Sequence, residues 1–232
     1  MIVYGKQIVL YLLRNHPKKI EEIFLAKDIE PKLFHQITRL GVKITRIDSK
    51  RAQAMARGGN HQGMFAQIAA LETISPTQVL AFSRLVVLCG VSDVGNIGSL
   101  IRTAYALGVE ALIVEGSFSL KAQETMMRSS SGAMLDLPIC FCSSLLDFIH
   151  HLKQKGFECY GASMHGECFS TFSAAKKWAL FLGSEGDGLR NKIIQKMDKI
   201  ISIEMQNNFD SLNVGVAGGI LMYGLVKNGR ES

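Results

Sequence analysis

The last two thirds of the chain alternate between apolar runs of strand length and segments with helical periodicity. Strands are expected at 85–89, 111–114, 137–140, 158–162, 179–182 and 199–203, and helices at 97–107, 120–128, 144–155, 191–197 and 214–227. Regular alternation of this kind implies a mostly parallel sheet with helices on both faces. The sequence therefore predicts an α/β fold for this part.

The first 70 residues predict a smaller α/β unit. A helix follows Gly5 and runs to residue 15, and a second helix runs from Pro31 to Leu40 and stops at Gly41. The other expected elements are strands at 20–26, 42–47 and 64–69 and a helix at 50–57. Pro and small polar residues at 72–78 are typical of a linker. We expect domains at 1–70 and 83–232, joined by a linker at 71–82.

The bulk composition of the 232 residues is that of a globular protein, with 47% hydrophobic and 20% charged residues. No apolar run approaches the ~20 residues of a membrane helix, and the first ten residues lack a signal-peptide pattern. We expect a cytoplasmic protein. The five cysteines do not suggest a disulfide framework. Cys140 and Cys142 have no second pair at zinc spacing, so no metal site is expected.

The positive charge is concentrated at the N-terminal end. Residues 1–80 carry 12 Lys or Arg against 6 Asp or Glu, whereas residues 81–232 carry 14 of each. This asymmetry favours a polyanion-binding module attached to a neutral one, with a solvated helical surface as the alternative. The basic face of residues 1–70 is therefore a candidate polyanion-binding surface.

Three polar segments follow apolar runs in the second part: Asp93–Arg102, Leu182–Leu189 and Asp210–Val214. Each offers backbone amides and one or two polar side chains, which suits one site for a small ligand and a phosphate-bearing partner. The glycine spacing differs from the Rossmann pattern, which disfavours a dehydrogenase. The Gly-Lys-Ser/Thr ending of a P-loop is also missing.

Together the three segments resemble the SpoU (TrmH) branch of the SPOUT RNA 2′-O-methyltransferases. Asn96-Ile-Gly-Ser-Leu-Ile-Arg102, Leu182-Gly-Ser-Glu-Gly-Asp-Gly-Leu189 and Ser211-Leu-Asn-Val214 match its three motifs in order and spacing. Tyr4-Gly5 and His61-Gln-Gly-Met64 resemble the ends of the small L30e-like RNA-binding domain found in some members. The resemblance covers nearly the whole chain.

The resemblance implies a C-terminal trefoil knot, a homodimer formed through the knotted region, and S-adenosylmethionine as cofactor. The positions that correspond to the cofactor site are Gly183, Gly186, Ile203, Met205 and Leu212. A glycine-rich loop suits this role because glycine tolerates a positive φ and lets the backbone approach an adenine.

The resemblance also implies a set of catalytic positions: Asn96, Arg102, Glu185, Ser211 and Asn213. Arg102 fits a phosphate clamp that orients the ribose better than it fits a base, because a guanidinium pKa lies above ~12. Structural roles remain as alternatives: Asn96 or Ser211 as a helix cap, Asn213 as a turn residue, and Glu185 as a solvated carboxylate.

Met126–Ala133 resembles a further family loop near the cofactor, with Ser131 where Ala is commoner. Arg128 in this loop is a candidate RNA contact, and an ordinary surface arginine is the alternative.

The chain departs from the family pattern at three positions. Glu204 stands in place of a usual Pro, Asn207 in place of a Gly, and Gly215 in place of a frequent Ser. Asn tolerates the left-handed conformation, but Glu204 adds a carboxylate beside the expected adenine site. We hypothesise weaker cofactor affinity than in typical members.

The expected function is methylation of a ribose 2′-hydroxyl in RNA. The L30e-like domain favours a guanosine of 23S rRNA, and a tRNA ribose is the alternative substrate. A non-catalytic RNA-binding protein is the alternative of another class. Retention of the five catalytic positions disfavours it, and Glu204 mildly favours it.

Overall fold

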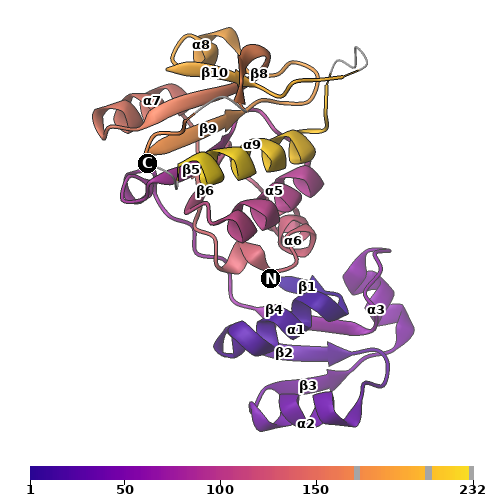
Figure 1. Cartoon of the computed structure of the whole chain (residues 1–232). Coiled ribbons are helices and arrows are strands. Elements are labelled where there is room, and N and C mark those ends of the chain that lie inside the picture. Colours follow the sequence, from indigo (N-terminus) through magenta and orange to yellow (C-terminus); the bar gives the residue numbers. More distant parts are fainter. Residues whose placement is uncertain (170–172, 207–210, 230–232) are drawn as a thin grey trace.

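The computed structural model describes residues 1–169, 173–206 and 211–229. It contains a four-stranded sheet with the order β1-β4-β2-β3 and a six-stranded sheet with the order β10-β8-β9-β5-β6-β7. Figure 1 shows the first sheet in an N-terminal unit and the second in a C-terminal unit above it.

The N-terminal unit has a mixed sheet, in which β2 pairs in parallel with β3 and β4 lies antiparallel to both β1 and β2. Its elements are β1 (Ile2–Tyr4), α1 (Lys6–Asn15), the 3-10 helix η1 (Pro17–Lys19), β2 (Ile20–Leu25), α2 (Pro31–Arg39), β3 (Lys43–Arg46), α3 (Ser49–Ala56) and β4 (Met64–Ile68). A one-turn helix, α4 (Pro76–Val79), follows before the second sheet begins.

All five strand pairs of the six-stranded sheet are parallel, which confirms the predicted α/β fold with a mostly parallel sheet. The elements are β5 (Arg84–Leu88), α5 (Val94–Leu107), β6 (Ala111–Glu115), α6 (Leu120–Ser129), the 3-10 helix η2 (Ala133–Leu135), β7 (Ile139–Cys142), α7 (Leu145–Gln154), β8 (Glu158–Cys168), β9 (Trp178–Leu182), α8 (Asn191–Ile194), β10 (Lys199–Ser202) and α9 (Val214–Asn228).

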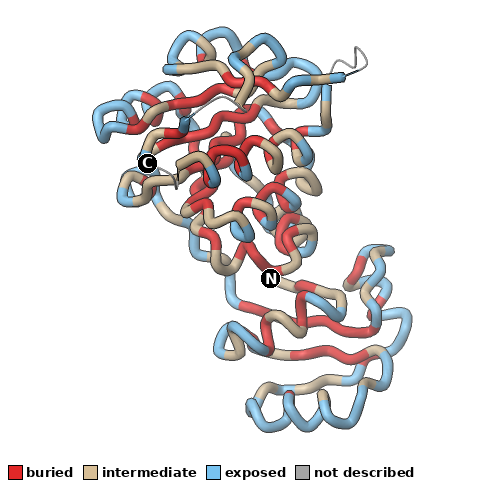
Figure 2. The backbone as a smooth tube through the Cα atoms, in the orientation of Figure 1, coloured by how far each residue is buried: buried red, intermediate tan, exposed pale blue. Residues whose placement is uncertain are grey.

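Helices cover both faces of this sheet because the strand side chains alternate between two apolar cores. Val86 and Leu88 of β5 lie in one core with buried residues of α5, α6 and α9. Val87, between them in sequence, lies in the other core with buried residues of α7 and α8. Burial on both faces explains why the strands are continuously apolar, and Figure 2 shows them as an almost uninterrupted buried layer.

The two units contact each other through β1 and α1 on one side and α6 and η2 on the other. The backbone N–H of Ile2 donates to Glu124 Oε1 at 3.0 Å, and Arg57 lies 3.7 Å from the same carboxylate. Further along the interface, the Tyr11 hydroxyl donates to Asp136. The N-terminal unit therefore meets the C-terminal unit beside the turn that joins α6 to η2.

Cys89, Cys140, Cys142 and Cys159 carry buried thiols, and Cys168 is half-buried. Burial raises the pKa of the Cys140 thiol to about 11 and that of Cys159 to about 12. In the parts of the chain described above, no helix is long and apolar enough to cross a membrane.

Some elements differ from the sequence-based expectation. Strand β1 was not expected, because three residues are too few to show alternation and Gly5, with φ +110°, separates them from α1. Strand β7 begins at Ile139, two residues late, directly after Pro138, which has no N–H to donate. Strand β8 continues to Cys168 because its second half pairs with Ile201 and Ser202 of β10.

Candidate active site

The candidate site is built at one edge of the six-stranded sheet, where the carboxyl ends of its strands meet. Since β5, β9 and β10 run in parallel, the segments that follow Leu88, Leu182 and Ser202 all emerge at this carboxyl edge. The backbone N–H of Cys89 donates to the Leu182 carbonyl at 2.8 Å, which joins the first two segments. Open α/β sheets place ligands at this edge.

The loop after β9 is a tight turn that requires glycine at its base. A Cβ on Gly183 would lie 2.1 Å from the carbonyl carbon of Gly188, because the loop folds back on itself. Ser184 pairs with Gly188, whose N–H donates to the Ser184 carbonyl at 3.0 Å. At the tip, Gly186 is exposed with φ +95°, and nothing lies within 4 Å of the position of a Cβ. The loop is closed at its base and open at its tip.

Asn96, Glu185 and Asn213, one from each predicted motif, form what we call the carboxyl-edge cluster. Glu185 Oε1 accepts a hydrogen bond from the Asn96 side-chain amide at 3.0 Å and from the Asn213 amide at 2.6 Å. The Asn213 amide also lies 3.2 Å from Asn96 Oδ1, and the N–H of Val214 lies 3.4 Å from Glu185 Oε1. One carboxylate oxygen therefore joins three segments that are far apart in sequence.

The helix caps beside the cluster are made by other groups than expected. Asp93 caps α5 by accepting from the Asn96 N–H at 2.7 Å, which leaves the Asn96 side chain free for the cluster. Asn213 caps α9 by accepting from the Gly215 N–H at 2.9 Å, so the cap is Asn213 and not Ser211. Ser211 is exposed two residues before this cap. The capping alternatives for Asn96 and Ser211 are therefore wrong.

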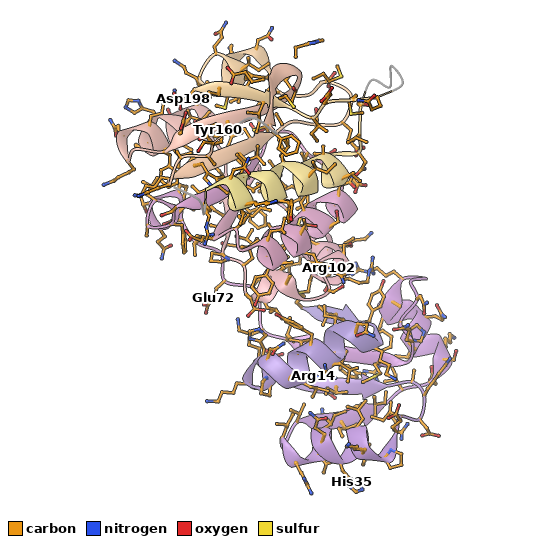
Figure 3. All side chains as sticks on the ribbon, in the orientation of Figure 1. Arg14, His35, Glu72, Arg102, Tyr160 and Asp198 are labelled. Carbon is orange, nitrogen blue, oxygen red and sulfur yellow. The ribbon has the colours of Figure 1, made fainter. Side chains whose placement is uncertain are left out.

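Arg102 lies on α5, six residues after Asn96 and so about 9 Å further along the helix axis. Its side chain is exposed, and Nη1 donates to the Ser131 hydroxyl at 3.2 Å. Within the described residues it has no carboxylate at salt-bridge distance. Figure 3 shows it toward the end of the C-terminal unit that is nearer to the N-terminal unit. A guanidinium with a single neutral partner keeps most of its donors available for a phosphate.

The predicted cofactor positions lie on three segments: Gly183 and Gly186 in the loop after β9, Ile203 and Met205 after β10, and Leu212 just before α9. Ile203 directly follows β10 and packs against the apolar core, and Met205 and Leu212 are also half-buried. Glu204 is exposed between Ile203 and Met205. Asn207 lies outside the described residues.

Arg128, the candidate RNA contact, is engaged by the N-terminal unit. Its guanidinium carbon lies 4.7 Å from the centre of the Tyr4 ring, and Nη1 donates to the Tyr4 hydroxyl. The Tyr4 hydroxyl in turn donates to the Ala56 carbonyl at 3.0 Å. Arg128 therefore joins the two units, whatever further contact it makes with RNA.

The structure gives a local steric explanation for Gly215, one of the departures from the family pattern. A Cβ at this position would lie 2.8 Å from the Ser99 hydroxyl and 3.0 Å from Asn213 Oδ1. The absence of a side chain lets the start of α9 approach α5 closely. The Asn213 cap and the Asn96 side chain can then meet at Glu185.

Sequence reasoning placed the Met126–Ala133 loop near the cofactor, but it did not pair Ser131 with Arg102 or Tyr4 with Arg128, and it did not single out Tyr11. Ser131 is 29 residues from Arg102 and Tyr4 is 124 residues from Arg128. No periodicity or spacing signals these contacts, because the first depends on tertiary packing within the C-terminal unit and the second on how the two units dock.

A cavity of about 520 Å³ lies at the carboxyl ends of β6 and β7. It is lined by residues that include Glu115, Ser143 and Arg190, and none of the predicted catalytic or cofactor positions lines it. Arg190 and Glu115 form an ion pair there. The candidate site is thus defined by its polar contacts and not by this cavity.

Residues 83–223 match the SpoU rRNA Methylase family, and residues 2–74 match the RNA 2′-O ribose methyltransferase substrate binding family. The 23S rRNA (guanosine-2′-O-)-methyltransferase RlmB of Escherichia coli is 30% identical over 97% of this chain and 98% of its own length. The RlmB of Salmonella typhimurium shows the same identity and coverage.

Solved structures share the fold. The AdoMet-bound rRNA methyltransferase from Sinorhizobium meliloti has a TM-score of 0.78 at 22% identity, covering 96% of this chain and 85% of its own. The SpoU methyltransferase AviRb from Streptomyces viridochromogenes, in complex with AdoMet, has a TM-score of 0.76 at 21% identity, covering 98% of this chain and 89% of its own.

Proposed function

This chain belongs to the SpoU rRNA methylase family, and we propose that its carboxyl-edge site methylates the ribose 2′-hydroxyl of a guanosine in 23S rRNA. The general activity follows from the family: the chain is an S-adenosylmethionine-dependent RNA 2′-O-methyltransferase. The observation that carries the proposal is the meeting of three family motifs on Glu185 Oε1, beside a glycine loop. The two RlmB relatives, which match this chain over nearly its full length, support the guanosine substrate.

The bound cofactor supplies an electrophilic methyl group, and the rest of the chemistry falls to the protein. Gly183 and Gly186, together with Ile203, Met205 and Leu212, are the groups we propose to hold it. Glu185 fixes the geometry of this pocket, because its Oε1 ties the loop after β9 to the starts of α5 and α9. Holding both reactants in a fixed orientation supplies much of the rate of such a transfer.

Arg102 is proposed to bind a phosphate next to the target ribose and so to orient its 2′-hydroxyl. Its planar fork suits two phosphate oxygens, and within the described residues no carboxylate competes for it. A guanidinium does not give up its proton at neutral pH, so the phosphate itself is the more suitable relay for the hydroxyl proton. Asn96, Ser211 and Asn213 are proposed to orient the ribose on the opposite side.

The proposed domain roles follow the charge distribution. Residues 1–70 form an L30e-like substrate domain whose basic face binds RNA, residues 71–82 form the linker, and residues 83–232 form the methyltransferase domain. Arg14, Lys18 and Lys19 at the end of α1 and in η1 are exposed and form no ion pair within the described residues. An rRNA substrate is met in the cytoplasm, which is where we place the protein.

We also propose that the C-terminal segment forms the trefoil knot and that two copies pair through it. After β10 at the sheet edge, the chain returns to place Asn213 on the loop after the central strand β9. Helices α5 and α9 then expose large apolar side chains: Tyr105, Val216 and Tyr223 are 44%, 51% and 58% exposed. A second copy that covers both helices accounts for this surface.

The proposal is tested by mapping 2′-O-methyl groups by mass spectrometry in rRNA and tRNA from cells that lack the protein. Loss at one guanosine of 23S rRNA is expected, with restoration by the wild-type gene. Loss of a methyl group at a tRNA position instead would identify tRNA as the substrate in place of 23S rRNA. No loss in any RNA would favour a non-catalytic RNA-binding protein.

A further inference from the structure

The turn that contacts Arg102 is held in an uncommon backbone conformation. Ser131 has φ +54°, which L-residues adopt rarely, and Gly132 follows with φ +95°. The N–H of Ser131 donates to the Arg128 carbonyl at 3.0 Å, and that of Gly132 donates to the Met127 carbonyl at 3.1 Å. This serine-rich turn (residues 129–133) is where the Ser131 hydroxyl meets Arg102 Nη1 at 3.2 Å.

Tyr11, from helix α1 of the N-terminal unit, packs directly on this turn. A Cβ on Gly132 would lie 2.7 Å from Tyr11 Cδ1, so the ring occupies the space that a side chain at Gly132 would need. The Tyr11 hydroxyl donates to Asp136, one residue past η2, and His16 Nε2 lies 2.9 Å from the same carboxylate. The Tyr11 ring therefore contacts Gly132 and its hydroxyl contacts Asp136, which are the two ends of the segment 132–136.

Tyr11 also reaches the helix that carries Arg102. Burial, the hydrogen bond to Asp136 and the nearby Tyr105 side chain all raise the pKa of Tyr11 well above its usual value. Tyr105 stands three residues after Arg102 on α5, so the two side chains lie on neighbouring positions of one helix face. Tyr11 thus packs on the turn that contacts Arg102 and lies near Tyr105 of the helix that carries the arginine.

We propose that Tyr11 is a positioning residue for Arg102 and acts through the serine-rich turn, so that docking of the N-terminal unit orients the guanidinium toward substrate phosphate. This inference rests on the proposed role of Arg102 in methyl transfer. It adds that a residue of the substrate-binding unit contributes to turnover as well as to RNA affinity. The Ser131 hydroxyl is the contact that transmits the effect.

A double-mutant cycle on the full-length protein tests the transmission. Tyr11→Phe keeps the ring on Gly132 but removes the hydrogen bond to Asp136, and Ser131→Ala removes the acceptor for Arg102. Each is expected to lower kcat about threefold to tenfold, with the KM for RNA and the cofactor affinity within about twofold. In the Ser131→Ala background, Tyr11→Phe is expected to cause no further loss. Independent, multiplicative losses would overturn the proposal.

Glu124→Gln is the matched control. Glu124 lies in the same interface and accepts from the N–H of Ile2, but it does not touch the turn. Its substitution tests whether any weakening of the interface lowers kcat. A loss equal to that of Tyr11→Phe would assign the effect to general docking and overturn the specific role of Tyr11.

A readout that does not depend on turnover separates this proposal from the proposed function. In ¹⁵N-labelled protein, the Arg102 Nε–H resonance is assigned by its disappearance in Arg102→Lys. It is expected to shift and to lose order in both Tyr11→Phe and Ser131→Ala, and to stay unchanged in Glu124→Gln. An unchanged resonance in Tyr11→Phe would overturn the positioning role, even if the wild-type protein methylated no RNA.

Discussion

The carboxyl-edge cluster and Arg102 differ in how tightly the protein holds them. Glu185 Oε1 is engaged by two side-chain amides and one backbone N–H, all within the C-terminal unit. Arg102 is exposed, has one neutral partner in the described structure, and contacts a turn that packs against Tyr11 of the other unit. The first arrangement satisfies its own polar groups, whereas the second leaves donors for a ligand. The contrast separates a cluster whose polar groups are paired within the protein from an arginine whose donors are available to a ligand.

The largest effect on this comparison is expected from substitution of Arg102. Arg102→Ala is expected to lower kcat/KM about 10²- to 10³-fold, since it removes two charge-assisted bonds to phosphate. Cofactor affinity, measured by calorimetry, is expected to be unchanged because the residue contacts no cofactor position. Arg102→Lys keeps the positive charge but lacks the planar guanidinium fork, so its kcat/KM is expected to lie between those of the wild type and Arg102→Ala. If Arg102→Ala also abolished cofactor binding, the arginine would have a structural role.

The carboxyl-edge cluster depends on the loop that carries Glu185. A steric clash at the base of this loop therefore tests how strongly the cluster relies on the loop conformation. Gly183→Ala places a Cβ 2.1 Å from the Gly188 carbonyl carbon, where only backbone movement can make room. We expect a loss of about 2–4 kcal/mol in the free energy of unfolding, measured by denaturant titration.

Gly186→Ala is the matched control for this loop, because it has open space but φ +95°. It is expected to cost about 1–2 kcal/mol. Equal losses for the two variants would show that conformational strain, and not the close approach at Gly183, governs the loop.

A smaller effect is expected at Glu185. Glu185→Gln keeps an oxygen acceptor but removes the charge that strengthens the bonds from Asn96 and Asn213. Cofactor affinity by calorimetry is expected to fall about tenfold. The Arg102–Ser131 contact lies outside the cluster, so the Arg102 Nε–H resonance is expected to stay in place. A shifted resonance would mean that the two parts are one network.

The smallest expected effect concerns the departure at Glu204. This exposed carboxylate lies beside Ile203, a proposed adenine contact. Glu204→Pro restores the usual family residue and is expected to raise cofactor affinity by about twofold to threefold, with Glu204→Gln separating the charge from the backbone effect. Calorimetric titration that shows no gain in either variant would count against the weak-affinity hypothesis.

The convergence of three motifs could be predicted from sequence because parallel strands bring their carboxyl ends to one edge. Asn96, Glu185 and Asn213 follow apolar runs in this way, and the structure brings them together. The partner of Arg102 could not be predicted, since Ser131 reaches it through a turn with φ +54°, 29 residues further along the chain, whose place depends on tertiary packing. Strand β1 was missed for a related reason: its register is set by pairing with Phe65 and its neighbours in β4, far along the chain.

The bonds of Asn96 and Asn213 to one carboxylate also have a consequence for how the protein is made. The two asparagines are 117 residues apart, and the second lies close to the last helix. During synthesis the N-terminal unit is complete long before Asn213 leaves the ribosome. A nascent chain can therefore present a folded RNA-binding surface while its methyl-transfer pocket still lacks one wall. RNA bound by such an unfinished chain would remain unmodified until the segment with Asn213 is in place.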